Sequence, residues 1–216
     1  MNYSKTIVGL VMSSGLVAVA CSSDDTSATT AGATAVTSTA VTSTSVTTST
    51  TATGGGMGGS GGATTCEAYC DAVTANCTGP NAQYGDHAMC VASCAGLPEG
   101  KASDMSGNTV GCRTYHAGAA KMDANTHCEH AGPGGAGVCG ADCDGFCAIA
   151  LEACASKYAT LAACQTECKT FKDTVPYNTN VTSGDSLACR LYHLTVATTV
   201  PDVHCDHIGA TSAPCK

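Results

Sequence analysis

Six of the seven histidines form two groups of three with the same internal spacing: His116, His127 and His130, and then His193, His204 and His207. In each group the second histidine follows the first by eleven residues, and the third follows the second by three. Three imidazoles, one on a helix and two on a short turn, match the ligand count of open zinc or type-2 copper sites. The spacing therefore predicts one metal site per group, and a bis-histidine haem is the alternative cofactor.

The same segments also fit a purely structural role. The first histidine of each group ends a Cys-Arg-x-Tyr-His sequence, at residues 112–116 and 189–193. An arginine and a tyrosine beside a disulfide can form a buried hydrogen-bond network, and imidazole adds one donor and one acceptor for loop carbonyls. Both interpretations stay open from the sequence. His87 has no counterpart in the second group and is predicted to lie on the surface.

Sixteen of the seventeen cysteines form two matched sets of eight. The intervals 4, 7, 4 and 16 recur at the same places in both sets, and the remaining three differ by one to three residues. The members are Cys66, Cys70, Cys77, Cys90, Cys94, Cys112, Cys128 and Cys139, and then Cys143, Cys147, Cys154, Cys164, Cys168, Cys189, Cys205 and Cys215. This pattern indicates an internal duplication, with one repeat over residues 66–140 and the other over 141–216.

Disulfides are the expected state of these cysteines. The chain has no tryptophan and two phenylalanines, and alanine dominates its apolar residues. A core of alanine removes little area from water, so a module of this size needs covalent cross-links, and four per repeat are predicted. The alternative is Cu(I) binding by thiolates, because the C-x3-C spacing resembles that of the copper-storage four-helix bundles.

The cysteine spacing also predicts helices. Positions 66, 70 and 77 fall at i, i+4 and i+11, which places them on one helix face, and positions 143, 147 and 154 repeat the pattern. Two antiparallel helices with facing C-x3-C pairs can be joined by nested bonds. Among the 105 pairings that eight cysteines allow, the expected ones are Cys66–Cys94, Cys70–Cys90, Cys143–Cys168 and Cys147–Cys164.

A third helix is predicted to begin at Asn108 in the first repeat and at Asp185 in the second. Both residue types are good N-caps, and helix-compatible sequence follows to about Met122 and Thr198. The larger apolar residues are scattered rather than alternating, so strands are not expected. The predicted fold is all-α, with two tandem, small, disulfide-rich modules of about three helices each.

The first twenty residues have the features of a secretory signal. Lys5 precedes an apolar run from Ile7 to Ala20, which is shorter than the ~18–20 residues that span a bilayer. Its end, Ala18 to Ala20, fits ordinary signal peptidase, which would release a soluble protein, and it also fits a lipobox before Cys21. Because Cys21 is the odd cysteine, lipid on its sulfur would remove an unpaired thiol from an oxidising compartment.

Residues 18–21 resemble the signals of bacterial lipoproteins, although Ala18 stands where leucine is commonest. The resemblance implies a diacylglyceryl thioether on Cys21 and an N-acyl chain such as palmitate, which together anchor a protein durably. Ser22 and Ser23, with no acidic residue directly behind the cysteine, imply sorting to the outer membrane. The C-R-x-Y-H and H-C-x-H signatures of both repeats are similar to cysteine-rich predicted lipoproteins of myxobacteria-like Gram-negative bacteria.

A low-complexity segment separates the signal from the repeats. Residues 22–65 consist mostly of Thr, Ser, Ala, Val and Gly, which cannot bury enough apolar surface to offset chain entropy. A disordered spacer with a reach of roughly 35–40 Å is therefore expected. The predicted domains are a signal peptide over 1–20, a lipid-anchored linker over 21–65, and the two repeats over 66–140 and 141–216.

Enzymatic motifs are absent from the sequence. It contains no G-x-S-x-G, H-E-x-x-H or P-loop pattern and no C-x-x-C-H for covalent haem, and the net charge of −8 disfavours nucleic acid as a partner. The predicted function is a non-enzymatic cell-envelope lipoprotein that displays two disulfide-stabilised modules in a structural or binding role. Its predicted partners are the membrane, through the anchor, and another envelope or extracellular protein. The alternative function is metal or haem binding by the two histidine groups, with copper, zinc or haem as cofactor.

Overall fold

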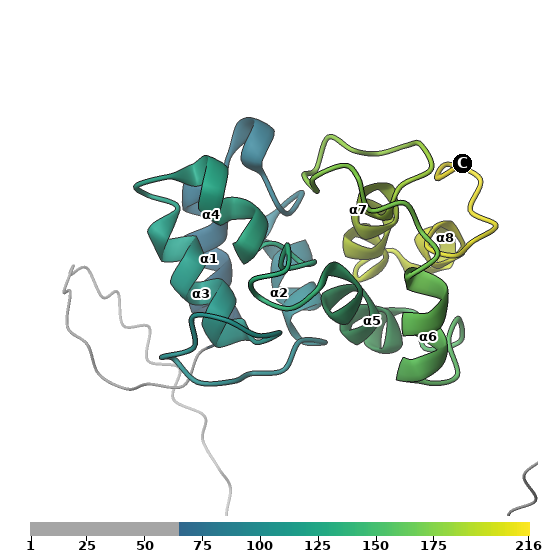
Figure 1. Cartoon of the computed structure of the whole chain (residues 1–216), viewed down its shortest axis with the longest axis horizontal. Coiled ribbons are helices and arrows are strands. Elements are labelled where there is room, and N and C mark those ends of the chain that lie inside the picture. Colours follow the sequence, from purple (N-terminus) through teal and green to yellow (C-terminus); the bar gives the residue numbers. More distant parts are fainter. Residues whose placement is uncertain (1–64) are drawn as a thin grey trace, which may run out of the picture. The chain divides into compact units, whose positions relative to one another are not determined.

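The computed structural model describes residues 65–216, in which all regular structure is helical (Figure 1). The first repeat comprises α1 (Cys66–Asn76), η1 (Gly79–Asn81), α2 (His87–Cys94), α3 (Val110–Ala119) and α4 (Ala124–Ala131). The second comprises α5 (Asp142–Ala153), α6 (Leu161–Cys168), α7 (Leu187–Ala197), α8 (Pro201–His204) and η2 (Cys205–His207). The all-α prediction is confirmed. The predicted signal peptide, Cys21 and almost all of the linker lie outside the described residues.

Each repeat has one helix more than expected. The segment that carries the second and third histidines was predicted as a short turn, but it forms α4 in the first repeat and α8 with η2 in the second. These helices are short and rich in His, Cys and acidic residues, so they lack the apolar periodicity by which sequence predicts a helix. As a result, His127 and His130 lie one turn apart on the same helix face.

The third helices begin later than the sequence predicted. The N-cap of α3 is Thr109, whose hydroxyl accepts a hydrogen bond from the Cys112 amide at 3.1 Å. Ser186 caps α7 in the same way. Asn108 and Asp185, the expected caps, instead bond the guanidinium groups of the arginines in these helices. The helices end at Ala119 and Ala197.

Eight disulfides join the sixteen described cysteines, and each of them stays within its own repeat. The first repeat contains Cys66–Cys94, Cys70–Cys90, Cys77–Cys128 and Cys112–Cys139. The second contains Cys143–Cys168, Cys147–Cys164, Cys154–Cys205 and Cys189–Cys215. The nested pairs between α1 and α2, and between α5 and α6, are those that the C-x3-C spacing suggested. Of the other two bonds in each repeat, one ties the histidine-bearing helix to the first helix of the hairpin, and one ties the closing loop to the third helix, α3 or α7.

One hydrophobic core runs through both repeats, where α2 packs against α5 and α7. Tyr177 joins them with its hydroxyl, which donates to the Gln83 carbonyl at 3.1 Å, while the Gln83 amide donates back to the Tyr177 carbonyl. Gly96 permits the close approach, since a Cβ there would lie 2.9 Å from the Cα of Ile149. None of the helices in residues 65–216 is long and apolar enough to cross a membrane.

Candidate metal sites

Two helices bring the three histidines of the first repeat together. His116 lies in the last turn of α3, while His127 and His130 lie on α4. The Cys77–Cys128 disulfide fixes α4 to the end of α1, because Cys77 is the C-cap of that helix. The helix that carries the two histidines is therefore held covalently through Cys128, which lies between them in the sequence.

The three imidazoles of the first repeat converge. Nδ1 of His116 lies 2.9 Å from Nδ1 of His127, and the rings of His116 and His130 meet edge to face with centroids 4.9 Å apart. One nitrogen from each of the three rings lies within 4.8 Å of the others. Nδ1 of His130 is buried and makes no hydrogen bond. A buried ring nitrogen without a partner is uncommon in a folded protein and leaves a donor or acceptor available for a ligand.

A main-chain carbonyl determines which nitrogen of His116 carries the proton. Nε2 of His116 lies 3.3 Å from the carbonyl oxygen of Met105. Because a carbonyl can only accept, Nε2 must be the donor, and in the neutral ring Nδ1 then carries the lone pair. The short contact with His127 is consequently a hydrogen bond in which His127 Nδ1 donates. Orientation of a ligating histidine through its other nitrogen is the usual arrangement in protein metal sites.

The second repeat reproduces this arrangement in detail. Nδ1 of His193 lies 2.9 Å from Nδ1 of His204, and Nε2 of His193 lies 3.2 Å from the carbonyl oxygen of Thr182. Nδ1 of His207 is again buried without a hydrogen bond. The clustered rings are somewhat closer here, with His204 and His207 centroids 5.4 Å apart against 6.1 Å in the first repeat.

Burial favours the neutral form of four of the six imidazoles. It lowers the pKa of His116, assisted by the neighbouring histidines, and it likewise lowers the pKa of His130. In the second repeat burial lowers the pKa of His193 and of His204. Neutral imidazole is the form that ligates metal ions, so the lone pairs are available at neutral pH without the removal of a proton.

The carbonyl that accepts a hydrogen bond from the first histidine, Met105 in the first repeat and Thr182 in the second, is called the clamp. The loop that contains it has the same construction in both repeats. Gly107 adopts φ +87 and donates its N–H to the Val138 carbonyl, while Gly184 adopts φ +92 and donates to the Pro214 carbonyl. Val138 and Pro214 each directly precede the cysteine of a closing disulfide. The closing loop thus fixes the clamp, and the left-handed backbone explains why glycine occupies this turn twice.

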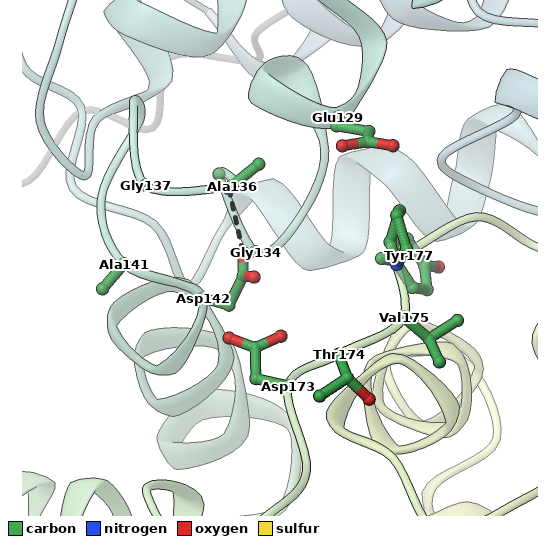
Figure 2. Close-up of a pocket in the computed structure, with 12 residues that line it drawn as sticks. Glu129, Gly134, Ala136, Gly137, Ala141, Asp142, Asp173, Thr174, Val175 and Tyr177 are labelled. Atoms are coloured by element: carbon green, nitrogen blue, oxygen red, sulfur yellow. Dashed lines mark hydrogen bonds between the residues drawn. The ribbon is translucent and has the colours of Figure 1, made fainter.

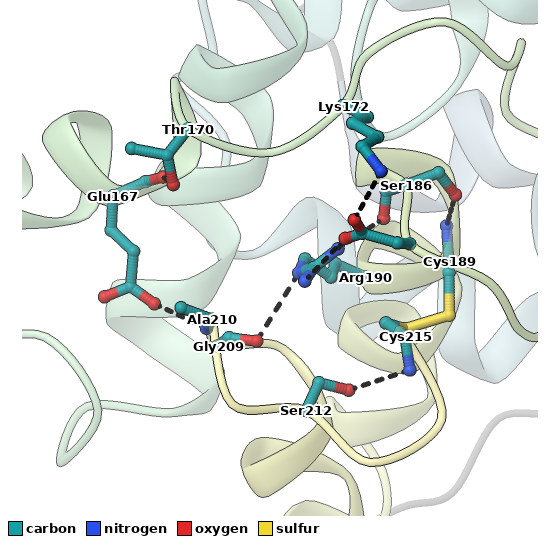
Figure 3. A network of polar contacts seen from close by, with 11 residues as sticks. Glu167, Thr170, Lys172, Ser186, Cys189, Arg190, Gly209, Ala210, Ser212 and Cys215 are labelled. Atoms are coloured by element: carbon teal, nitrogen blue, oxygen red, sulfur yellow. Dashed lines mark hydrogen bonds and ion pairs between the residues drawn. A yellow bond between two sulfur atoms is a disulfide. The ribbon is translucent and has the colours of Figure 1, made fainter.

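A buried arginine bonds the segment that follows the histidine-bearing helix in each repeat. Arg113 is fully buried, and its guanidinium donates to the carbonyls of Gly132 and Pro133, which follow α4. Figure 3 shows the counterpart in the second repeat, where Arg190 donates to the carbonyls of Gly209 and Ser186. The arginine of each Cys-Arg-x-Tyr-His sequence therefore forms the network that the structural interpretation predicted. The tyrosine does not, since Tyr115 is 42% exposed.

The acidic residue between the second and third histidines points away from the cluster in both repeats. Glu129 lines a separate pocket of about 470 Å³ between the repeats, together with Asp142, Asp173 and Tyr177 (Figure 2). Asp206 pairs with Lys157 at 3.5 Å. The six clustered histidines do not line the pocket. Each cluster therefore offers nitrogen ligands alone, and the carboxylates stay outside it.

The structure brings together the six histidines of the two predicted groups but not the seventh. All six clustered histidines come together in threes, whereas His87 is separate and bonds Asp71 at 3.1 Å near the surface. The carbonyls of Met105 and Thr182 were missed, because a main-chain acceptor leaves no signal in the residue type. Among residues 65–216 every cysteine is in a disulfide, so thiolates for Cu(I) storage are not available there.

Comparisons with known proteins give a family and distant relatives. Residues 22–142, more than half of the chain, match the family described as the BfoA family C-terminal domain. "Aurasperone B biosynthesis cluster protein A" of Aspergillus niger and "Bifonsecin B biosynthesis cluster protein A" of Aspergillus brasiliensis are each 36% identical to it over 64 residues. Those residues are 29% of this chain and 21% and 22% of the relatives, so the chain spans about a fifth of their length. No solved structure matches the chain.

Proposed function

The chain belongs to the BfoA family through its C-terminal domain, and on that premise we propose that it is a non-enzymatic metal-binding protein of the cell exterior. Each repeat binds one transition-metal ion through its three histidines. The observation that carries the proposal is the repetition of the whole arrangement: a carbonyl-clamped histidine, a second ring nitrogen 2.9 Å away, and a buried third nitrogen without a partner.

The unpartnered nitrogens favour an ion over a purely structural cluster. Two of the three imidazoles in each repeat satisfy one another, as His116 and His127 do, but the third leaves a buried polar atom unpaired. An unpaired buried nitrogen costs about 1–3 kcal/mol. A purely structural network does not explain why a buried nitrogen is unpaired at the same position of both repeats. A metal ion explains it, because the nitrogen would be a ligand.

A porphyrin fits this geometry less well than a single ion. Bis-histidine haem needs its two imidazoles on opposite faces of the ring, and nitrogens 2.9 Å apart leave no space for that plane between them. The second candidate function is a structural or display role for the modules. The hydrogen bond that already joins His116 to His127 favours it, since the pair is stable without an ion.

The proposed location rests on the cysteines. The sixteen cysteines of residues 65–216 are all paired with one another, which suits an oxidising compartment, and Cys21 is the seventeenth. We place Cys21 as the site of lipid attachment, so that the linker would hold the two repeats away from an envelope membrane. The partners would be that membrane and the proteins or ions at its surface.

Metal content of the full chain, purified from its own envelope and reconstituted with Zn²⁺ and Cu²⁺ separately, tests the function. We expect two ions per chain, one ion for either His130→Ala or His207→Ala, and none for the double variant. His87→Ala is the matched control and should retain two. A metal content well below one per chain after reconstitution, with unchanged stability in chelator, would support the structural role instead.

The anchor has a separate test. Mass spectrometry of the mature N-terminus should find acyl chains on Cys21, and Cys21→Ser should move the protein from the membrane fraction to the soluble fraction. A soluble wild-type protein that begins at Cys21 without acyl chains would contradict the anchor and leave the metal sites untouched.

A further inference from the structure

We propose that the resident ion is Cu(II), held in a square-based arrangement in which Nδ1 of His116, and of His193 in the second repeat, is a ligand. This inference rests on the proposed metal-binding function and adds the identity of the ion and the ligand atoms. It starts from the carbonyl clamps, which leave Nδ1 as the one nitrogen of each clamped ring with a free lone pair.

The distance between the first two ligand atoms, which a hydrogen bond sets in the metal-free protein, matches a right-angled geometry. The Nδ1 atoms are 2.9 Å apart in both repeats. Around an ion with metal–nitrogen bonds of about 2.0–2.1 Å, adjacent corners of a square are roughly 2.9 Å apart and corners of a tetrahedron roughly 3.3 Å. The ion would take the place of the hydrogen between the two rings, and His127 would carry its proton on Nε2 instead of Nδ1. Tetragonal nitrogen sites are typical of Cu(II) or Ni(II), and tetrahedral ones of zinc.

The ligand chemistry points the same way. Each cluster offers neutral imidazole nitrogens, while Glu129 and Asp206 face elsewhere and the nearby cysteines are in disulfides. Calcium and magnesium need oxygen ligands, so they are excluded. Copper(I) prefers thiolate or thioether sulfur, and a nitrogen-only site ranks Cu(II) above nickel and zinc. The oxidised cysteines also indicate surroundings in which copper stays divalent.

The clamp makes a tetrahedral ion harder to accommodate. A zinc ion would spread the first two nitrogens by about 0.4 Å, and the hydrogen bond of His116 to the Met105 carbonyl resists any part of that movement that His116 makes. That carbonyl is held in turn by the loop fixed to Val138. The second repeat would meet the same resistance at Thr182.

Electron paramagnetic resonance of the Cu(II)-loaded full chain tests the geometry. We expect an axial spectrum with hyperfine coupling to three nitrogens, which keeps its shape at half the intensity in His207→Ala and is lost in the double variant His130→Ala/His207→Ala. Competition should give copper at least about tenfold tighter binding than zinc. His87→Ala, which lies outside both clusters, is the control and should leave the spectrum unchanged.

The possible results distinguish failure of the copper assignment from failure of the proposed metal-binding function. Zinc binding equal to or tighter than copper, or a spectrum of a flattened tetrahedron, would overturn the copper assignment and leave the metal sites standing. Failure of both ions to bind would overturn the function itself. For the ligand atom, nitrogen NMR of the metal-free chain should find His116 and His193 as Nε2–H tautomers; the opposite tautomer would refute Nδ1 ligation.

Discussion

The two repeats build the same histidine cluster on different supports. In the first, the buried Arg113 has only neutral acceptors within hydrogen-bond reach, namely carbonyls and the Asn108 amide oxygen. In the second, Arg190 pairs with the Asp185 carboxylate at 3.4 Å and lies over the Phe171 ring, 4.1 Å from its centroid. The Nδ1–Nδ1 distance and the Nε2–carbonyl distance of the first histidine agree within 0.1 Å despite this exchange of partners. The partners of the buried arginine therefore differ between the repeats, whereas the hydrogen bonds of the first histidine are the same in both.

A second difference concerns charge beside the clusters. Asp123 interacts electrostatically with His127, although its carboxylate mainly caps α4 through Thr126. Val200 occupies the corresponding place in the second repeat. The two sites therefore have the same ligand atoms in unequal electrostatic surroundings, and substitutions that exchange these features between repeats can separate the two contributions.

The largest effect is expected from the disulfide beneath each histidine-bearing helix. Cys77–Cys128 and Cys154–Cys205 both close loops of sequence separation 51. Replacing either pair by alanines should lower the free energy of unfolding by about 4 kcal/mol, from the entropy of a loop that long. Chemical denaturation of the two double variants measures this. Losses that differ by more than about 1 kcal/mol would show that the repeats are not energetically equivalent.

The buried arginines should differ in their importance. Arg113→Met leaves several buried carbonyls unpaired, so we expect the free energy of unfolding to fall by about 3 kcal/mol. Arg190→Met should cost roughly 1–3 kcal/mol, because Asp185 is 43% exposed and can be solvated. Urea unfolding of both variants tests the order, and a larger loss at Arg190 would contradict it.

Asp185 should contribute to the acid sensitivity of the second repeat. The hydrogen bond from Lys172, at 2.8 Å, and the nearby Arg190 lower the pKa of Asp185. A carboxyl whose pKa is lowered by folding stabilises the protein above its unfolded pKa of about 3.9 and loses that contribution as the pH falls through the folded value. Asp185→Asn should therefore reduce the melting temperature at pH 7 and flatten its fall below pH 4. An unchanged acid profile would remove Asp185 from this account.

The smallest effect is expected at the charge beside the first cluster. Asp123→Asn keeps an N-cap of equal quality and removes the charge, so copper affinity at the first repeat should weaken about twofold. Val200→Asp should strengthen the second site by a similar factor. Calorimetric titration of chains with one intact cluster measures both, and high salt should abolish the difference.

The cysteines carried most of the fold prediction. Their fixed intervals gave the duplication and the helical hairpins, because a C-x3-C pair has one natural partner on a facing antiparallel helix. The starts of α3 and α7 were misplaced by one residue, since Asn108-Thr109 and Asp185-Ser186 offer two capping residues in a row and the arginine decides between them. The histidine spacing placed the clusters, but tautomers depend on main-chain oxygens that no residue type encodes.

The confinement of every described disulfide to its own repeat has a consequence for biogenesis. Under the proposed export from the N-terminus, residues 66–140 would reach the oxidant before the second set of cysteines. The first repeat can then select its bonds among 105 pairings rather than among those open to sixteen cysteines. When the repeats oxidise one after another, a further copy of the module can be added without mispairing. Its cysteines meet only disulfides that have already formed in the earlier copies.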